Sequence, residues 1–341
     1  MNLGTAITTA LFPCLTYALL LAIGFLLVKI KKLDKKGIDT IIMIMLNVLI
    51  PLMVFKCVYD SGMTIDVLLN NYKVLVGALI VFVVLLIVHL LEALILRLKP
   101  ESKWIYMLTG GFGNTGMVGV PIVLGIFSGS DEVMQMAALG IALYTLPDII
   151  LAYTLAPYFS KKHLNGKVEN PMAGQPLGKR FIAKVKDIFN PVVIGVVIGI
   201  IFCFAGIKLP SFLYDVVAYA FNGAVVCSAL YLGGLMGFAK LAKMFTGGRK
   251  YVHIVSKMFV MPIILFLLLG LLDLHPVFRV FLAMMAAMPT NCTLPAFAHM
   301  YHADEDLAVE LNLMGTIVAI ISMPLIFVIC SLIAPEILQY I

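Results

Sequence analysis

The amino-acid sequence predicts an all-α polytopic membrane protein of ten transmembrane helices, arranged as two inverted five-helix repeats in which helices 4 and 9 are broken and cross. Three observations predict this fold class. Hydrophobic residues make up 62% of the 341 residues and charged residues only 12%, whereas soluble domains contain about 25% charged residues. Lys and Arg gather in alternate connections between apolar runs, and two of those runs carry helix-breaking residues at matching positions.

The apolar runs define ten predicted spans, with lengths suited to crossing about 30 Å of hydrocarbon as helices. The first run is too long for the apolar core of a signal peptide, and no basic residue precedes it, so it is predicted to be a span. The sixth is short and the ninth is interrupted by prolines. The predicted spans are residues 6–28, 38–59, 74–96, 104–128, 134–157, 190–207, 211–238, 252–272, 277–301 and 308–334.

The distribution of Lys and Arg predicts the orientation of the chain. The connections after spans 2, 6 and 8, taken together with the first turn of span 9, hold only Lys73, Lys208 and Arg279. Most other basic residues lie in the connections after spans 1, 3, 5 and 7: Lys29, Lys31, Lys32, Lys35, Lys36, Arg97, Lys99, Lys103, Lys161, Lys162, Lys167, Lys179, Arg180, Lys184, Lys186, Lys240, Lys243, Arg249 and Lys250. Basic connections stay in the cytoplasm. We therefore expect a multi-pass protein of the plasma membrane, the inner membrane of a bacterium, with both termini extracytoplasmic. The net charge of +6 follows from this topology, so the lipid bilayer is the expected partner and nucleic acid is not.

The chain divides into two halves of five spans each. Residues 1–157 form the first five-helix repeat, residues 158–189 a cytoplasmic linker, and residues 190–341 the second repeat. Pro13 and Pro191 are 178 residues apart, Asn47 and Asn222 are 175 apart, and the pairs Asn114/Asn291 and Pro147/Pro324 are each 177 apart. An odd number of spans per half inverts the second half relative to the first, which is typical of secondary transporters.

The fourth predicted span contains a segment that a continuous helix does not favour. Residues 110–121 include five glycines, Asn114 and Pro121. Glycine costs about 1 kcal/mol relative to alanine in a helix, and proline removes a backbone donor. Backbone groups freed in hydrocarbon must be satisfied internally. The composition therefore predicts a break that is covered by protein or lines a wet cavity.

The ninth predicted span has a second break at the corresponding place. Residues 287–296 include two prolines, two threonines and Asn291. Paired interrupted spans indicate a transporter binding site, and the helix N-termini that a break exposes favour an anion. The candidate substrate-binding residues are Asn114, Thr115, Gly116, Pro121, Pro289, Asn291, Thr293 and Pro295. The alternative is a pair of closely packed, proline-kinked helices.

Ionisable residues are uncommon inside the predicted spans and include Lys56, His89, Glu92, Asp148, Asp215 and Lys257. Intramembrane charge is costly and indicates function. Asp148, which follows Pro147, is the candidate group for coupling to a proton or sodium ion or for gating the substrate, or else the structural partner of a lysine. Lys56 and Lys257 are expected to extend towards the membrane surface. His89 and Glu92 are expected to be interfacial or helix-packing groups.

Enzyme activity is not expected. The sequence lacks the metalloprotease, serine-hydrolase and Walker A motifs, and its six cysteines form no CxxC pair. No cofactor and no metal site is predicted. A membrane receptor that senses an anion without moving it is an alternative, although no cytoplasmic signalling domain is recognisable.

The two breaks resemble the crossover motifs of the auxin efflux carrier family, which includes plant auxin exporters and bacterial malate and malonate permeases. The segment Asn114 to Ile122 is similar to the first motif, and Pro289 to Tyr301, with its trailing Ala298-His299-Met300-Tyr301, is similar to the second. The likeness extends to span number, topology and length. The second segment departs from the plant pattern at Thr290 to Thr293.

The resemblance implies a scaffold of spans 1, 2, 6 and 7, and a moving transport domain of spans 3–5 and 8–10. It implies an elevator-like alternating-access carrier of small organic anions such as dicarboxylates, acting as a homodimer. The departure in the second motif makes auxin a poor candidate substrate. Cation-coupled symport and sodium/proton antiport by the same broken-helix architecture are the alternatives.

Overall fold

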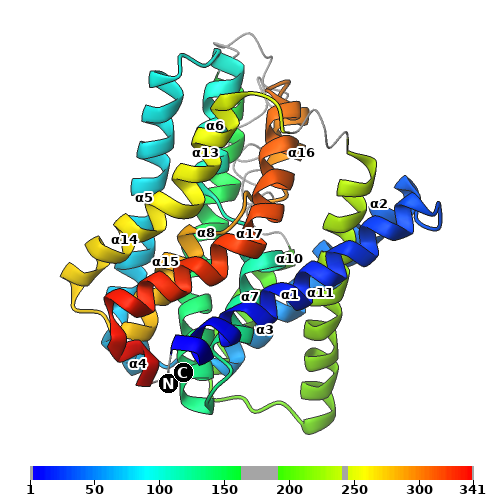
Figure 1. The fold of residues 1–341 in the computed structure, drawn as a ribbon. Coiled ribbons are helices and arrows are strands. Elements are labelled where there is room, and N and C mark those ends of the chain that lie inside the picture. Colours follow the sequence, from blue (N-terminus) through cyan, green and yellow to red (C-terminus); the bar gives the residue numbers. More distant parts are fainter. Residues whose placement is uncertain (1–2, 163–190, 240–244, 340–341) are drawn as a thin grey trace, which may run out of the picture.

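The computed structural model describes residues 3–162, 191–239 and 245–339, and within these ranges the named elements are all helices (Figure 1). Seven helices are long and apolar enough to cross a membrane: Ile7–Lys29, Lys35–Asp60, Tyr72–Ile95, Asp131–Ser160, Ser211–Phe238, Gly248–Leu272 and Glu305–Ile333. Three shorter apolar helices, Thr115–Ile126, Pro191–Phe204 and Pro276–Ala286, accompany them. The chain is therefore a multi-pass helical membrane protein, and the ten-span inverted repeat stays a prediction.

The first half of the chain forms a series of helices and two short π-helical turns. In order they are α1 (Leu3–Lys29), α2 (Lys35–Ile44), the π-helical turn η1 (Met45–Leu49), α3 (Ile50–Asp60), α4 (Ile65–Asn70), α5 (Tyr72–Ile95), α6 (Pro100–Gly111), the π-helical turn η2 (Thr115–Gly119), α7 (Val120–Ile126) and α8 (Asp131–Lys162). The helix α8 extends into the segment predicted as linker, because residues 158–162 continue it. The rest of that segment lies outside the described residues.

The second half of the chain is also a series of helices and short π-helical or 3₁₀ turns. Its elements are α10 (Pro191–Phe204), α11 (Ser211–Phe238), α13 (Gly248–Val255), the π-helical turn η3 (Ser256–Val260), α14 (Met261–Leu269), the 3₁₀ turn η4 (Gly270–Leu272), α15 (Pro276–Ala286), α16 (Leu294–Met300), α17 (Glu305–Ile333) and the 3₁₀ turn η5 (Pro335–Gln339). The helix α10 has 14 residues, which at 1.5 Å per residue is shorter than the hydrocarbon core.

Each π-helical turn ends two residues before a proline. Pro51, Pro121 and Pro262 stand at the second position of α3, α7 and α14. A proline has no N–H and its ring crowds the carbonyl one turn before it, so the backbone ladder shifts locally to the wider i→i+5 pattern. The sequence therefore places irregular backbone inside three membrane-embedded segments, one of them beside the first break.

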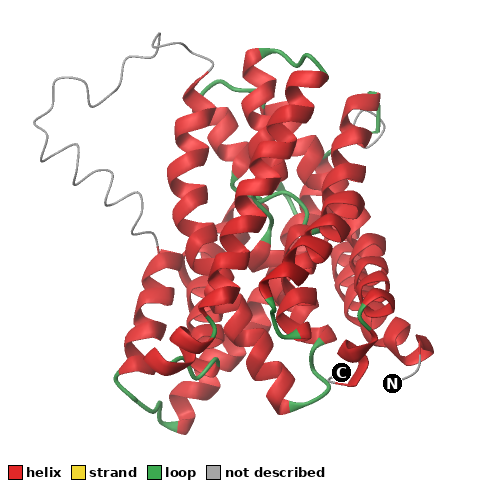
Figure 2. Cartoon of the chain, turned by 90° about the vertical axis from the view of Figure 1, so that its left-hand side faces the viewer, coloured by secondary structure: helices red, strands yellow, loops and turns green. Residues whose placement is uncertain are grey.

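The helices pack in two groups, visible in Figure 1 as the lower right and the left of the molecule. One group contains α1, α3, α10 and α11, and the other contains α5, α6, η2, α7, α8, α14, α15 and α17. Contacts of α1 with α7 and α17, and of α3 with α8, join the groups. The marks for the two chain ends lie side by side at one end of the molecule in both views (Figures 1 and 2).

The outward faces of the helices are apolar, as a lipid environment requires. On α5, Val83, Ile87 and Leu91 are each about half exposed, and their spacing of four residues places them on one stripe. The opposite side of α5 carries the fully buried Phe82 and His89. A helix that exposes large apolar side chains while burying a histidine fits a bilayer and not water.

Two glycines let α1 and α11 approach closely. A Cβ atom on Gly233 would lie 2.0 Å from the carbonyl oxygen of Leu21, and one on Gly24 would lie 2.4 Å from that of Leu230. Small residues at helix contacts allow backbones to pack tightly in membranes. The contact between α1 and α11 therefore depends on these two positions.

We expect Gly233→Val to destabilise the protein by about 1–3 kcal/mol, because the new side chain overlaps main-chain atoms that cannot move away. The measurement is thermal unfolding in detergent. Gly248→Ala is the matched control, since a Cβ there meets nothing within 4 Å. Equal unfolding temperatures for wild type and Gly233→Val would contradict the close approach.

Candidate functional site

The two predicted breaks are present, and they meet in the interior of the molecule. The helix α6 ends at Gly111 and η2 begins at Thr115, while α15 ends at Ala286 and α16 begins at Leu294. Between them, Gly113 and Thr290 form an antiparallel β-bridge. The N–H of Asn114 donates to Pro289 O at 2.7 Å, and the N–H of Asn291 donates to Phe112 O at 3.1 Å. Figure 2 shows these non-helical segments about halfway between the ends of the bundle.

The main-chain pairing explains why these residue types occur at the crossing. A Cβ atom on Gly113 would lie 2.8 Å from Met288 Cβ, so only glycine permits the segments to touch there. Pro289 has no N–H to satisfy and offers only its carbonyl, which Asn114 occupies. Each break thus satisfies backbone groups that the other break leaves open, as buried backbone requires.

The Thr290 side chain and side chains from two other segments, η3 and α17, complete the hydrogen bonding around the crossing. The Thr290 hydroxyl donates to Thr109 O at 3.1 Å, and the Asn312 amide donates to Thr290 O at 2.6 Å. The Lys257 ammonium donates to Thr109 O at 2.6 Å and to Phe112 O at 3.3 Å. These donors satisfy carbonyls at the C-terminal end of α6, which have no intrahelical partners, and the carbonyl of Thr290 in the second break.

A central cavity of about 70 Å³ lies on the other side of the crossing. Most of the predicted site residues line it, since Asn114, Thr115, Gly116, Asn291, Thr293 and Asp148 all contribute. Its further lining residues are Leu46, Ile50, Val54, Met117, Thr145, Ile149, Val192 and Cys292. Three buried polar atoms of this lining, Asn114 Nδ2, Thr145 Oγ1 and Asp148 Oδ1, have no hydrogen-bond partner among the described residues.

Asp148 is the carboxylate of the central cavity. Its side chain is only 4% exposed, and its Oδ2 accepts a hydrogen bond from the Thr115 hydroxyl at 3.0 Å. It also interacts electrostatically with Lys257. Burying a carboxylate is costly unless it is paired or serves a function. The sequence-based choice of Asp148 thus falls on a residue of the cavity, and its role in coupling stays a prediction.

Asn291 has a structural task in addition to lining the cavity. Its Oδ1 accepts from the Thr293 N–H and from the Thr293 hydroxyl, both at 2.9 Å. This arrangement fixes the turn before α16, as short polar side chains do at helix starts. The Thr293 hydroxyl is therefore already engaged with Asn291, whereas the Asn114 amide is open to a ligand.

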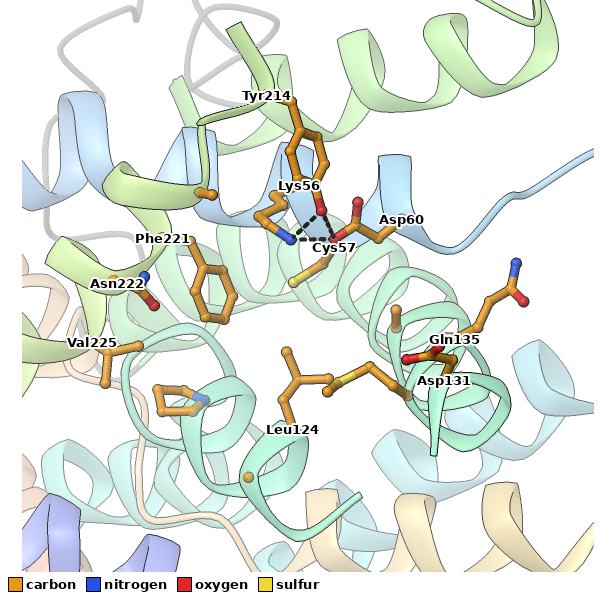
Figure 3. A pocket seen from close by; sticks show the side chains of 15 residues that line it. Lys56, Cys57, Asp60, Leu124, Asp131, Gln135, Tyr214, Phe221, Asn222 and Val225 are labelled. Atoms are coloured by element: carbon orange, nitrogen blue, oxygen red, sulfur yellow. Dashed lines mark hydrogen bonds and ion pairs between the residues drawn. The ribbon is translucent and has the colours of Figure 1, made fainter. Parts of the chain in front are cut away.

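Two of the three remaining predicted site residues line larger cavities. Pro121 lines a cavity of about 810 Å³ between α3, α7, α8 and α11. Figure 3 shows this cavity with Lys56, Asp60 and Tyr214 joined by hydrogen bonds on one wall. Pro295 lines a cavity of about 430 Å³, which also contains Cys292 and residues from the start of α2 and the end of α11. Pro289 lines none of these three cavities and packs against Gly315.

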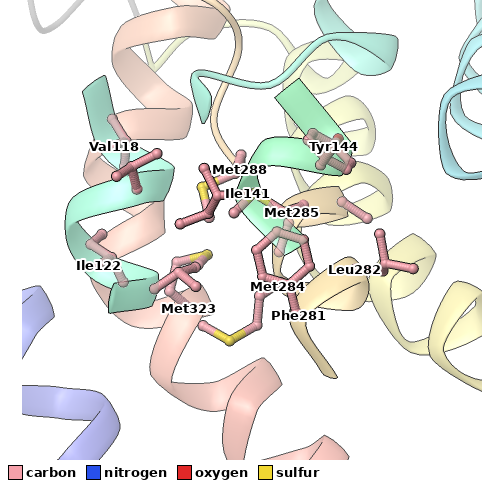
Figure 4. Packing of buried hydrophobic residues seen from close by; sticks show 14 of the residues in the cluster. Val118, Ile122, Ile141, Tyr144, Phe281, Leu282, Met284, Met285, Met288 and Met323 are labelled. Carbon is pink, nitrogen blue, oxygen red and sulfur yellow. The ribbon is translucent and has the colours of Figure 1, made fainter. Parts of the chain in front are cut away.

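A methionine-rich core packs behind the crossing. Figure 4 shows Met284, Met285, Met288 and Met323 gathered with Phe281, and these side chains are fully or almost fully buried. Methionine side chains are flexible and fill irregular spaces. Such a core tolerates changes in the packing of the crossing segments better than a core of branched side chains does.

The expectation that Lys257 extends to the membrane surface is wrong, and the surroundings of Lys56 are now defined. Lys257 does not extend to the membrane surface, because it is 1% exposed and binds the carbonyls at the crossing. The reason is that unpaired helix-end carbonyls lie within its reach and offset the cost of burying the ammonium. Lys56 pairs with Asp60 and donates to Tyr214 at the wall of the 810 Å³ cavity.

Sequence reasoning missed the polar residues that adjoin Lys257. His253 is fully buried, and its Nε2 lies 3.3 Å from the Thr109 hydroxyl. It stands four residues before Lys257, a spacing that places both on one helix face and could have pointed to it. Its ring centroid is 4.7 Å from that of His89, whose Nδ1 lies 2.8 Å from Glu92 Oε2.

The cluster of His89, Glu92 and His253 is the one group of metal-ligand type found among the described residues. Its ligand atoms lie within 4.8 Å of one another, so by residue type and distance it could hold a metal ion. Lys257, however, interacts electrostatically with both histidines. Its positive charge opposes a cation there, so we assign no metal to the cluster.

Apolar membrane-embedded helices that surround a polar crossing of two interrupted segments define a membrane transport protein. The chain belongs to the membrane transport protein family (Mem_trans), the auxin efflux carrier family, whose model matches residues 7–327. None of the curated proteins compared with the chain matches it.

Proposed function

We propose that the protein is a secondary transporter of small organic anions, such as dicarboxylates, which binds the substrate carboxylate at the crossing. The observation that carries this proposal is the central cavity, where the buried Asn114 amide lacks a partner within the described chain. An unsatisfied buried amide costs about 1–3 kcal/mol, and a carboxylate oxygen accepts from it well. Family membership fits a transporter and not an enzyme.

The backbone at the start of η2 supports an anion in the same place. The first N–H groups of a helix have no intrahelical acceptor, and the positive end of the helix dipole lies there. Thr115, Gly116 and Met117 begin the twelve-residue apolar helix Thr115–Ile126, and all three line the central cavity. A carboxylate there would accept from these groups and from the Asn114 amide together.

The charge of Asp148 points to a proton as the coupling ion. A substrate carboxylate in the cavity would repel an ionised Asp148, and the repulsion is strong where water is excluded. A protonated Asp148 instead offers a hydrogen-bond donor. We therefore propose that a proton on Asp148 accompanies the anion, and that sodium coupling or sodium/proton antiport is the outcome that would replace this assignment.

Alternating access is supported by the three cavities. The central cavity has space for about two water molecules, so a dicarboxylate needs it to widen. The 810 Å³ and 430 Å³ cavities contain residues from opposite ends of the helices, Asp60 and Asp131 in one and Lys35 and Asp39 in the other. We propose that the site opens first to one of these cavities and then to the other. The opening accompanies an elevator-like movement of the group with α5, α8 and α15 against the group with α1, α3 and α11.

Such a movement must break contacts between the two groups. The Tyr17 hydroxyl donates to Met117 O at 2.8 Å and the Ser228 hydroxyl donates to the same oxygen at 3.0 Å. Both link α1 and α11 to the first turn of η2. We further propose a homodimer in the plasma membrane, or bacterial inner membrane, with the lysine-rich connections in the cytoplasm and both termini outside. The basic-residue distribution supports this orientation, and the family resemblance supports the dimer.

We expect Asn114→Ala to lower substrate affinity by about tenfold or more, because a hydrogen bond to a charged group contributes about 1.5–3 kcal/mol. Asn291→Asp should lower it as well, since the carboxylate can still accept from Thr293 but repels the substrate. The measurement is saturable uptake of labelled malate, malonate, citrate and lactate into proteoliposomes. Asn47→Ala, which changes an exposed asparagine of η1, is the control. If both site variants bind the substrate with wild-type affinity, the substrate site lies elsewhere.

We expect Asp148→Asn to retain exchange of substrate for substrate but to lose acceleration by an inward proton gradient, because the neutral amide cannot bind and release a proton. Wild-type uptake should rise as the pH on the uptake side falls, since protonation of Asp148 removes the repulsion. Counterflow and gradient-driven uptake measure the two activities separately. Asp215→Asn on the exposed face of α11 is the control. If Asp148→Asn responds to the proton gradient as wild type does, Asp148 is structural.

A further inference from the structure

We propose that Lys257 is a built-in cation, which occupies the negative end of the interrupted helix α6 where a free sodium ion would otherwise bind, so that transport needs no sodium. The inference rests on the proposed function for its transport measurements. It goes further, because it assigns a residue that fixes which ion the carrier can use.

The geometry places the ammonium on helix-end carbonyls. Lys257 lies on η3 and is 1% exposed. Its Nζ donates to Thr109 O at 2.6 Å and to Phe112 O at 3.3 Å. Both carbonyls belong to the end of α6, where the helix dipole is negative. The contact joins segments 148 residues apart in the sequence, so it holds η3 against the crossing.

The same carbonyls are the ligands that a hard cation would take. Sodium in broken-helix transporters binds unwound carbonyls and the C-terminal ends of half-helices. Here Thr109 O also accepts from the Thr290 hydroxyl, and Phe112 O also accepts from the Asn291 N–H. Protein donors therefore occupy both oxygens, and the positive charge of the ammonium repels a second cation.

The charged and titratable groups around Lys257 come from three helices. His89 of α5 and His253 of α13 interact with it electrostatically, and Asp148 of α8 is the carboxylate that does so. The ammonium thus offsets the charge of Asp148 across the crossing, or of an anion bound beside Asp148. A free cation is not needed for this balance.

A second lysine provides a matched comparison. Lys29 donates to Gly237 O at 2.9 Å near the end of α11, so it also places an ammonium on a main-chain carbonyl of a membrane helix. Its side chain is exposed at the lysine-rich end and is remote from the crossing. Lys29→Gln therefore removes the same chemistry without touching the site.

The first test measures uptake of labelled malate or malonate into proteoliposomes in sodium or in choline. Wild type should transport equally, within about twofold, in both. The uptake rate of Lys257→Gln in choline should be at least about tenfold lower than that of wild type. Added methylammonium should restore part of the uptake by Lys257→Ala. Lys29→Gln should behave as wild type. Sodium-dependent wild-type uptake, or undiminished uptake by the Lys257 variants in choline, would overturn the inference.

The second test needs no transported substrate. Sodium should raise the unfolding temperature of detergent-purified Lys257→Ala, because the vacated carbonyls then accept it, and should leave wild type unchanged relative to choline. Lys257→Gln serves if the alanine variant is not obtained folded. An equal effect of sodium on wild type and variant would overturn the inference. If wild type moves no carboxylate but this contrast is seen, the proposed function fails and the assignment of Lys257 stands.

Discussion

The pairing of two interrupted helices by main-chain hydrogen bonds is the constraint on which the rest of this structure depends. A membrane leaves no water for the free backbone groups of a broken helix. The chain solves the problem by breaking two helices at the same depth and crossing them, so that Asn114 binds Pro289 and Asn291 binds Phe112. Gly113 is small enough for the contact, and the methionine-rich core behind it fills the irregular space that remains.

The crossing separates opposite charges onto its two sides. On one side, Lys257 satisfies carbonyls at the end of α6, and Asn312 satisfies the Thr290 carbonyl in the second break. On the other side, the first turn of η2 exposes N–H groups towards the central cavity, together with the Asn114 amide. Asp148 lies on this second side, opposite Lys257 in charge and coupled to it electrostatically. We propose that a site of this kind combines an anion, a proton and the lysine ammonium within one moving unit, and this is the basis of the proposed carrier.

The location of the breaks could be predicted from the sequence because glycine, proline and asparagine act locally on the backbone. The seven long spans were predictable for the same reason, since hydropathy and length decide them. The position of the Lys257 side chain could not be predicted, because it depends on how η3 packs against α6, which is far away in the sequence. The support of Thr290 by Asn312 also arises from the fold and leaves no local signal, whereas the contact of Asn291 with Thr293 joins residues only two apart and is of the kind that short polar side chains make at helix starts. The linker at 163–189 lies outside the described residues, and the inverted repeat stays a prediction.

The most direct test of the central claim uses Cys292, which lines the central cavity and whose Sγ lies 3.3 Å from Met117 Sδ. Alkylation of each cysteine by a small maleimide would be followed by mass spectrometry in the presence and absence of malate or of another transported carboxylate. A carboxylate held at the crossing should slow the reaction of Cys292 and leave Cys203, on α10, unchanged. Unaltered labelling of Cys292 with protection of Cys57, which lines the 810 Å³ cavity, would show that the substrate binds elsewhere and would contradict the account.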